Sequence, residues 1–149
     1  MVNTKVTLSG WELDNPIIPA SGTFGFGKEF AELYDINILG SFCFKGTTPV
    51  ERFGNPTPRI ADCDTGMINS IGLQNPGADH VIAYELPEMK RYFHKKVIAN
   101  LGGSTTEDYV GLAERFGREE QVGILEINIS CPNVRCGGMA FGTSPEKAY

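Results

Sequence analysis

The sequence predicts an α/β fold built on a parallel sheet, and three observations predict it. Strand-like runs alternate with helical segments four times along the 149 residues. Most of these runs are apolar on both sides, which is typical of parallel strands covered by helices. Both a doubly wound sheet and a (β/α)8 barrel fit this alternation. Polar residues collect where the runs end, and this favours the barrel, because the carboxyl ends of barrel strands form one active-site face.

The first predicted elements are a β-hairpin and one strand–helix unit. The stretch VTLSGWEL contains two short alternating runs around Ser9 and Gly10, which are turn residues. Residues 15–22, NPIIPASG, predict a short buried strand that runs into a glycine turn. Residues 27–36, GKEFAELYDI, carry apolar side chains at helical spacing and predict the first helix.

A long irregular stretch separates the second strand from its helix. Residues 38–48, ILGSFCFKGTT, predict a buried strand. Residues 49–77 are rich in Gly, Pro and Asn and have little helical periodicity. A loop of this length inside a compact domain is usually functional. Residues 80–93 predict a helix, although Pro87 is expected to kink it.

The third unit has the clearest helix signal. Residues 96–103, KVIANLGG, predict a buried strand. Residues 104–117 predict a helix that begins with a capping box from Ser104 to Glu107.

The fourth strand comes close to the end of the sequence. Residues 123–130, GILEINIS, predict it, and Ser144 followed by Pro145 predicts the start of another helix. Four strand–helix units are half of a barrel of roughly 250 residues. We therefore expect residues 1–149 to be the N-terminal half of a single barrel domain.

Composition and charge exclude several classes of protein. The net charge of −5 argues against a nucleic-acid surface, which requires a basic stripe. No apolar run approaches the roughly 18 residues that a membrane span needs, and the opening residues lack the apolar core of a signal peptide. We expect a cytoplasmic protein. The four cysteines form no CxxC pair, which predicts reduced thiols rather than disulfides, a zinc site or an iron–sulfur cluster; they are Cys43, Cys63, Cys131 and Cys136.

Cys131 is the first candidate for chemistry. It directly follows the fourth predicted strand in ILEINISCPNV, and Pro132 stiffens the loop that presents it. A free cysteine is more often buried and inert, but an accessible thiolate can act as a nucleophile or a general base. His80 and His94 lie on or beside a predicted helix, away from the strand ends. This disfavours a Cys–His hydrolase and leaves a base that removes a carbon-bound proton.

Lys45 and two asparagines complete the predicted polar rim. A lysine that ends an apolar strand in a barrel mouth would stabilise an anion, either a substrate carboxylate or charge on a cofactor ring. Gly46 allows a close backbone approach. Asn100 and Asn128 each interrupt an apolar strand, and a buried amide costs free energy unless it is hydrogen-bonded. Such amides indicate a flat hydrogen-bonding ligand, for which a flavin or a pyrimidine would qualify.

Two glycine-containing segments have competing interpretations. In residues 67–77, MINSIGLQNPG, the residues Asn69, Ser70 and Gly72 are either ordinary turn residues or a loop that closes over a small polar ring. Residues 22–28, GTFGFGK, lack both the Walker spacing and the GxGxxG order. They predict a strand-to-helix turn rather than a nucleotide site.

Five motifs resemble the catalytic subunit of class 1 dihydroorotate dehydrogenases. In order and spacing they are NPIIPASGTFGFG, FKGTT, NSIGLQNPG, ANLGG and EINISCPNV. The ASGTFGFG turn and the GGMAFGTSP stretch are similar to class 1B, the NAD-linked heteromeric type. The resemblance covers essentially all of the chain, and it implies a (β/α)8 barrel that holds FMN at its C-terminal face.

The resemblance also implies a reaction and a set of site residues. The reaction is oxidation of dihydroorotate to orotate in de novo pyrimidine biosynthesis. Cys131 would take the proton from substrate C5 while the C6 hydride passes to flavin N5. The flavin-contacting positions would be Ser21, Lys45, Gly46, Asn100 and Asn128. The substrate-contacting positions would be Lys45, Asn69, Ser70, Ile71, Gly72, Leu73, Asn128 and Asn133.

Partners follow from the same resemblance. A class 1B catalytic subunit forms a homodimer and passes electrons to a partner subunit that carries FAD and a 2Fe-2S cluster, giving a heterotetramer that reduces NAD. Three alternatives stay open: a fumarate-linked class 1A enzyme, a related pyrimidine-reducing flavoprotein, and an inactive half-barrel. Because later strands should supply further ligands, we expect the 149 residues alone to bind FMN poorly and to turn over little.

Overall fold

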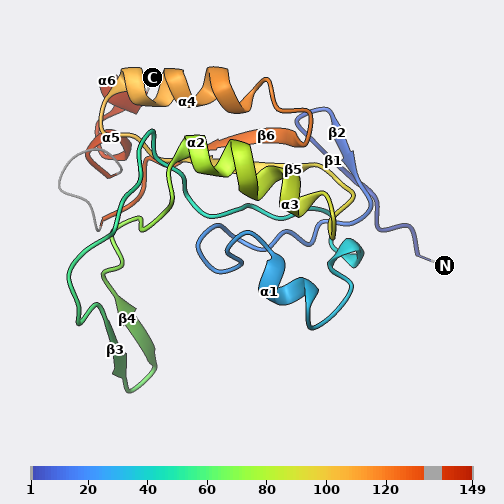
Figure 1. Cartoon of the computed structure of the whole chain (residues 1–149), viewed down its shortest axis with the longest axis horizontal. Coiled ribbons are helices and arrows are strands. Elements are labelled where there is room, and N and C mark those ends of the chain that lie inside the picture. Colours follow the sequence, from blue (N-terminus) through green and yellow to red (C-terminus); the bar gives the residue numbers. More distant parts are fainter. Residues whose placement is uncertain (1, 133–138, 149) are drawn as a thin grey trace.

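A parallel β–α–β unit forms the upper part of the fold as drawn in Figure 1. The structure is a computed structural model and describes residues 2–132 and 139–148. Strand β5 (Val97–Leu101) pairs in parallel with β6 (Val122–Ile127), and helix α4 (Thr106–Phe116) connects them. All five residues of β5 are buried. This confirms the predicted third and fourth strands and the helix between them.

The first two predicted strands are present as extended segments rather than regular strands. The amide of Phe44 donates to the Ile98 carbonyl at 3.1 Å, and parallel bridges join this segment to β5. The amides of Gly40 and Cys43 donate to the carbonyls of Ile17 and Pro19 at 3.1 and 3.0 Å. Donor and acceptor numbers rise together, so these segments are also parallel. The two extended segments, β5 and β6 thus lie side by side in chain order, with regular strand pairing only between β5 and β6. The described residues form no closed barrel, and the full barrel stays a prediction.

The first helix is much shorter than predicted. Helix α1 (Lys28–Ala31) has 4 residues and is followed by a 3-10 turn, η1 (Ile36–Ile38). Its N-cap, Gly27, offers no capping side chain, and the Asp35 side chain accepts from the Asn37 amide at 3.0 Å. That local bond starts a turn in competition with the helix. The predicted helix over 27–36 is therefore wrong beyond its first turn.

Pro87 is accommodated without breaking its helix. Helices α2 (Ala78–His80) and α3 (Leu86–Met89) are joined by a π-helical turn, η2 (Val81–Glu85). Proline has no N–H to donate, and a wider turn directly before it is one way to absorb that loss. The helix ends at Met89, four residues before the predicted end.

The cap of α4 is shifted by one residue from its predicted position. Thr105, not Ser104, is the N-cap, and its hydroxyl accepts from the Asp108 amide at 3.2 Å. The Asp108 carboxylate accepts in return from the amides of Thr105 and Ser104, at 3.2 and 2.8 Å. This register buries the apolar side of the helix, namely Tyr109, Leu112 and Phe116.

Two hairpins lie at opposite ends of the molecule (Figure 1). The predicted hairpin is confirmed as β1 (Val6–Leu8) and β2 (Trp11–Leu13). A second hairpin, β3 (Ile60–Cys63) with β4 (Gly66–Asn69), occupies part of the segment predicted to be an irregular loop. All its strand residues are exposed, so no alternation of buried and exposed positions marks it in the sequence.

The described part of the chain ends in two short helices, α5 (Met139–Gly142) and α6 (Pro145–Ala148). Helix α6 begins where Ser144 and Pro145 predict it, and the Ala148 amide donates to the Ser144 carbonyl at 3.0 Å. Helix α5 was not predicted.

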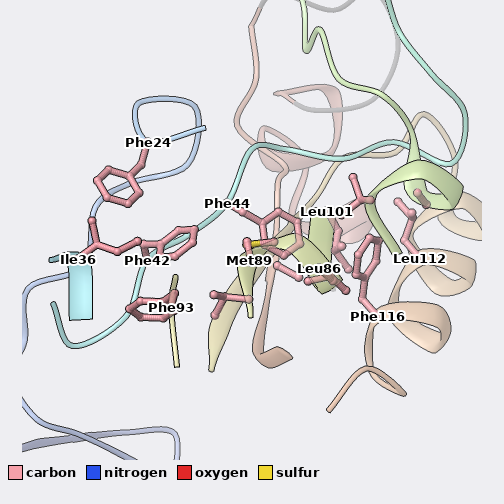
Figure 2. Close-up of a cluster of buried hydrophobic side chains, with 14 of the residues drawn as sticks. Phe24, Ile36, Phe42, Phe44, Leu86, Met89, Phe93, Leu101, Leu112 and Phe116 are labelled. Atoms are coloured by element: carbon pink, nitrogen blue, oxygen red, sulfur yellow. The ribbon is translucent and has the colours of Figure 1, made fainter. Parts of the chain in front are cut away.

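One face of the sheet packs against the helices and forms the core (Figure 2). Phe42 and Phe44 project from the second extended segment into this cluster. The Phe42 ring lies 4.9 Å from the Phe93 ring, and the Phe44 ring lies 5.8 Å from that of Phe116. From β5, the residues at every second position join them: Val97, Ala99 and Leu101. The intervening residues of the same segments are therefore free to face the other way.

Candidate active site at the carboxyl edge of the sheet

The second face of the sheet carries polar side chains near the carboxyl ends of its strands, although the buried Ile98 lies on the same face. Cys43 and Lys45 alternate with the core residues Phe42 and Phe44, and Asn100 lies between the core residues Ala99 and Leu101. Asn100 is in register with Glu126 on β6. Since side chains alternate along a strand, these residues share one face near the carboxyl ends of the strands.

A chain of hydrogen bonds joins the two predicted asparagines. The Asn100 side-chain amide donates to Glu126 Oε1 at 2.5 Å, and the Asn128 side-chain amide donates to Asn100 Oδ1 at 3.2 Å. The backbone fixes Asn128: its amide donates to the Leu101 carbonyl, and Tyr109 donates its hydroxyl to the Asn128 carbonyl, both at 2.8 Å. Asn100 is 2% exposed, so its hydrogen bonds offset the desolvation of its amide.

Lys45 is a half-buried cation at the same edge. Burial lowers the pKa of its ammonium group, and the charge of Cys131 acts in the opposite direction. The structure records no salt bridge of Lys45 within residues 2–132 and 139–148. A partly desolvated ammonium group of this kind favours an anionic ligand.

Gly46 has no room for a side chain. A Cβ atom there would lie 2.6 Å from Asn100 Oδ1 and 3.2 Å from Leu73 Cδ2. The Leu73 side chain also approaches Gly102 closely. The backbone at Gly46 is therefore packed directly against the Asn100 amide, and this close contact requires glycine.

The two cysteines near Lys45 differ in environment. Cys131 is half-buried and free, and it interacts electrostatically with Lys45. Cys43 is buried, and its thiol donates to Glu126 Oε1 at 3.3 Å. Burial, followed by the Glu126 charge, raises the pKa of Cys43 well above its usual range, and Ser21 hydrogen-bonds its sulfur. The thiol of Cys43 is thus held protonated, whereas that of Cys131 is the accessible one.

The segment predicted to contact substrate is only partly gathered at this edge. Asn69 ends β4, and Ser70 follows it on the exposed hairpin, where its amide donates to the Arg59 carbonyl at 2.8 Å. The chain then turns through Gly72 and Leu73, both with positive φ. Leu73 reaches Gly46, and Ile71 bonds locally through its amide to Asn69 Oδ1 at 3.4 Å. Asn133 and Cys136 lie outside the described residues.

Three residues at this edge of the sheet were missed from the sequence, namely Cys43, Arg52 and Glu126. Glu126 and Cys43 sit two positions from Asn128 and Lys45, so strand periodicity was the signal that could have found them. Arg52 lines a pocket of about 280 Å³ together with Lys45 and Gln74. It comes from the long segment 49–77 that the sequence marks as functional.

Two negative findings apply to the described residues. Among them, no group of three or more His, Cys, Asp or Glu side chains is arranged to hold a metal ion. No helix within the same residues is long and apolar enough to cross a membrane.

Comparison with curated proteins and crystal structures gives one consistent result. The chain is 56% identical over 148 residues to the dihydroorotate dehydrogenase B (NAD(+)) catalytic subunit of Anoxybacillus flavithermus, covering 99% of the chain and 47% of the relative. It is 53% identical over 149 residues to the same-named subunit of Listeria welshimeri, covering 100% and 49%. The chain thus spans about half the length of the curated relatives it matches.

The fold agrees with this result. Ligand-free DHODH from Eimeria tenella superposes with a TM-score of 0.69 at 24% identity, covering 89% of this chain and 40% of that one. The complex of Eimeria tenella DHODH with ferulenol gives 0.67 at 25% identity, covering 89% and 38%. The family model described as dihydroorotate dehydrogenase matches residues 3–149. The chain belongs to the dihydroorotate dehydrogenase family.

Proposed function

We propose that this chain supplies the N-terminal half of the active site of an NAD-linked dihydroorotate dehydrogenase, which oxidises dihydroorotate to orotate in pyrimidine biosynthesis. One observation carries the proposal: Lys45, the Asn100–Asn128 pair and the accessible thiol of Cys131 belong to one edge of a parallel sheet. Residues 1–149 would be half of a single (β/α)8 barrel domain.

The residues present fit a flavin, which membership of the family implies. The amide donors of Asn100 and Asn128 and the ammonium group of Lys45 suit the polar edge of a planar ring. We propose FMN as this flavin, held by Ser21, Lys45, Gly46, Asn100 and Asn128. When bound, FMN supplies the acceptor for the substrate hydride.

The protein groups then divide the remaining work. Cys131 acts as the general base that takes the proton from substrate C5. Lys45 holds the substrate carboxylate, and Asn128 orients the flat ring, which lowers the entropic part of the barrier. The further substrate contacts in the proposal are Asn69, Ser70, Ile71, Gly72, Leu73 and Asn133.

Partners belong to the same proposal. The relatives are named catalytic subunits, and that name implies a second subunit in those proteins. We propose such a partner here, carrying FAD and a 2Fe-2S cluster and reducing NAD, with a homodimer of the catalytic chain in a cytoplasmic heterotetramer. Assays of the complete catalytic polypeptide with NAD and with fumarate, with and without the partner, test this. Fumarate turnover by the catalytic chain alone would contradict the NAD-linked assignment.

Cys131→Ser tests the proposed base. In the complete polypeptide we expect the variant to keep its flavin absorbance but to lose at least about hundredfold in turnover near neutral pH. Turnover should recover as pH rises, because a hydroxyl is much less acidic than a thiol. Cys63→Ser is the matched control, since Cys63 is an exposed thiol on the β3–β4 hairpin. Equal turnover of the wild type and Cys131→Ser at neutral pH would remove Cys131 from the mechanism.

A further inference from the structure

We propose that Glu126 is a positioning residue that sets the direction of the Asn100 and Asn128 amides, so that both offer N–H donors to the ligand ring. The inference rests on the proposed function for the identity of that ring. The orientation of the two amides is argued only from the hydrogen bonds that join Glu126, Asn100 and Asn128.

The hydrogen bond between Glu126 and Asn100 can run in only one direction. A side-chain amide has a donating and an accepting end, and space alone does not decide which end points where. A carboxylate accepts only. Because Glu126 Oε1 lies 2.5 Å from Asn100 Nδ2, the amide must turn its NH2 group toward Glu126 and its oxygen away.

The orientation of the Asn100 amide in turn determines the orientation of the Asn128 amide. Asn100 Oδ1 can only accept, and it takes the bond from Asn128 Nδ2 at 3.2 Å. Asn128 Oδ1 then accepts from the Ser130 amide at 3.4 Å. Both amide oxygens are therefore engaged within the protein. Each NH2 group uses one of its two hydrogens in this chain and keeps the second for a ligand.

Cys43 provides the Glu126 carboxylate with a second donor. Its thiol donates to the same oxygen, Oε1, at 3.3 Å. Cys43 is 2% exposed, and its raised pKa keeps it a donor. Glu126 itself is exposed in the described chain, so these two donors are what fixes its carboxylate. The resulting rim of donors matches a planar ring that presents carbonyl oxygens or unprotonated ring nitrogens.

A double-variant cycle in the complete polypeptide tests the inference. The variants are Glu126→Gln, Asn100→Asp and the two combined. Glu126→Gln keeps the shape but can donate, so it releases the amide direction and should weaken flavin binding about tenfold. Asn100→Asp places two carboxylates in contact and should lower both Tm and flavin affinity.

The combined variant separates direction from simple packing. The amide introduced by Glu126→Gln would donate to the carboxylate introduced by Asn100→Asp. That carboxylate would still accept from Asn128, so the hydrogen bonds from residue 126 through residue 100 to Asn128 stay complete, and only the bond from Cys43 is lost. We expect the Tm of the combined variant to return close to the wild-type value, with partial recovery of flavin affinity. Glu114→Gln, an exposed change on α4, is the charge control and should alter neither.

Two readouts keep the inference separate from the proposed function. Tm is measured on the flavin-free protein, and flavin affinity by quenching of flavin fluorescence. A wild type that binds no flavin would defeat the proposed function, yet the Tm cycle would still report the Glu126–Asn100 polarity. Losses in Tm that simply add in the combined variant, or wild-type flavin affinity in Glu126→Gln, would overturn the inference.

Discussion

The two faces of the sheet differ in chemistry near the carboxyl ends of its strands, although the same segments build both. One face carries Phe42 and Phe44 into the core, and the other carries Cys43 and Lys45 to the carboxyl edge. Residues that stabilise the core and residues of the candidate site therefore alternate along the same segment. A register slip by a single residue would exchange them. The faces should therefore respond in opposite ways to substitution.

The largest expected effect comes from the helix-facing side. Phe44 is fully buried and packs near Phe116. Phe44→Ala should lower the free energy of unfolding by about 3–5 kcal/mol, because it removes buried apolar contacts and leaves a cavity. Urea unfolding followed by circular dichroism measures the loss. Phe53→Ala is the control, since Phe53 is 79% exposed and should change stability little. Equal losses in both variants would mean that this face is not the core.

Lys45→Met should act in the reverse direction. Removing a half-buried ammonium group relieves its desolvation, so stability should stay equal or rise by about 1 kcal/mol or less. Binding of orotate, followed by the flavin absorbance change, should weaken at least about tenfold. A clear loss of Tm with unchanged orotate affinity would place Lys45 among the structural residues.

The pH dependence of stability tests whether burial lowers the pKa of Lys45. Burial lowers the pKa of folded Lys45 below its ordinary value of 10.5. Between the lowered pKa and 10.5 the unfolded chain binds more protons at this group than the folded chain does. This group's contribution to stability should therefore rise with pH through that window. Chemical unfolding across alkaline pH measures the slope. The slope should be smaller in Lys45→Met, and an identical slope in both proteins would contradict the lowered pKa.

The smallest expected effect concerns the helix that covers the core face. Thr105→Ala should destabilise the protein by about 1 kcal/mol, because Thr105 caps α4. Ser104→Ala should change stability by less than about 0.5 kcal/mol, since the Ser104 hydroxyl has no part in the capping box. Thermal unfolding of the two variants compares them directly. A larger loss for Ser104→Ala would restore the capping box that the sequence alone predicts.

Elements that bury one face could be predicted from the spacing of their apolar residues. Elements that are exposed on all sides leave no such pattern in the sequence. Strand β5 and helix α4 were predicted because apolar spacing marks them. The β3–β4 hairpin was missed because all its residues are exposed. The α4 cap was placed one residue early, since neighbouring Ser104 and Thr105 both suit an N-cap and only the tertiary register selects between them.

The candidate site, too, could be predicted from the sequence only in part. Lys45, Asn100 and Asn128 are conspicuous because each is a polar residue in an apolar run. Glu126 shares a strand face with Asn128 by periodicity, but it resembles an ordinary solvent-facing charge, and its register with Asn100 identifies the contact. The approach of Leu73 to Gly46 joins residues far apart in the sequence, so no local pattern could place it.

Trp11 lies at the amino end of β6, where its ring would meet a Cβ atom at Gly123 at 2.9 Å. It is the only tryptophan in the 149 residues, and it sits at the opposite end of that strand from Asn128. Its indole emission is therefore an intrinsic optical probe of the first hairpin's docking. During unfolding, the Trp11 emission could shift to the red before the helical circular dichroism is lost. That order would show that the hairpin detaches as a separate cooperative unit.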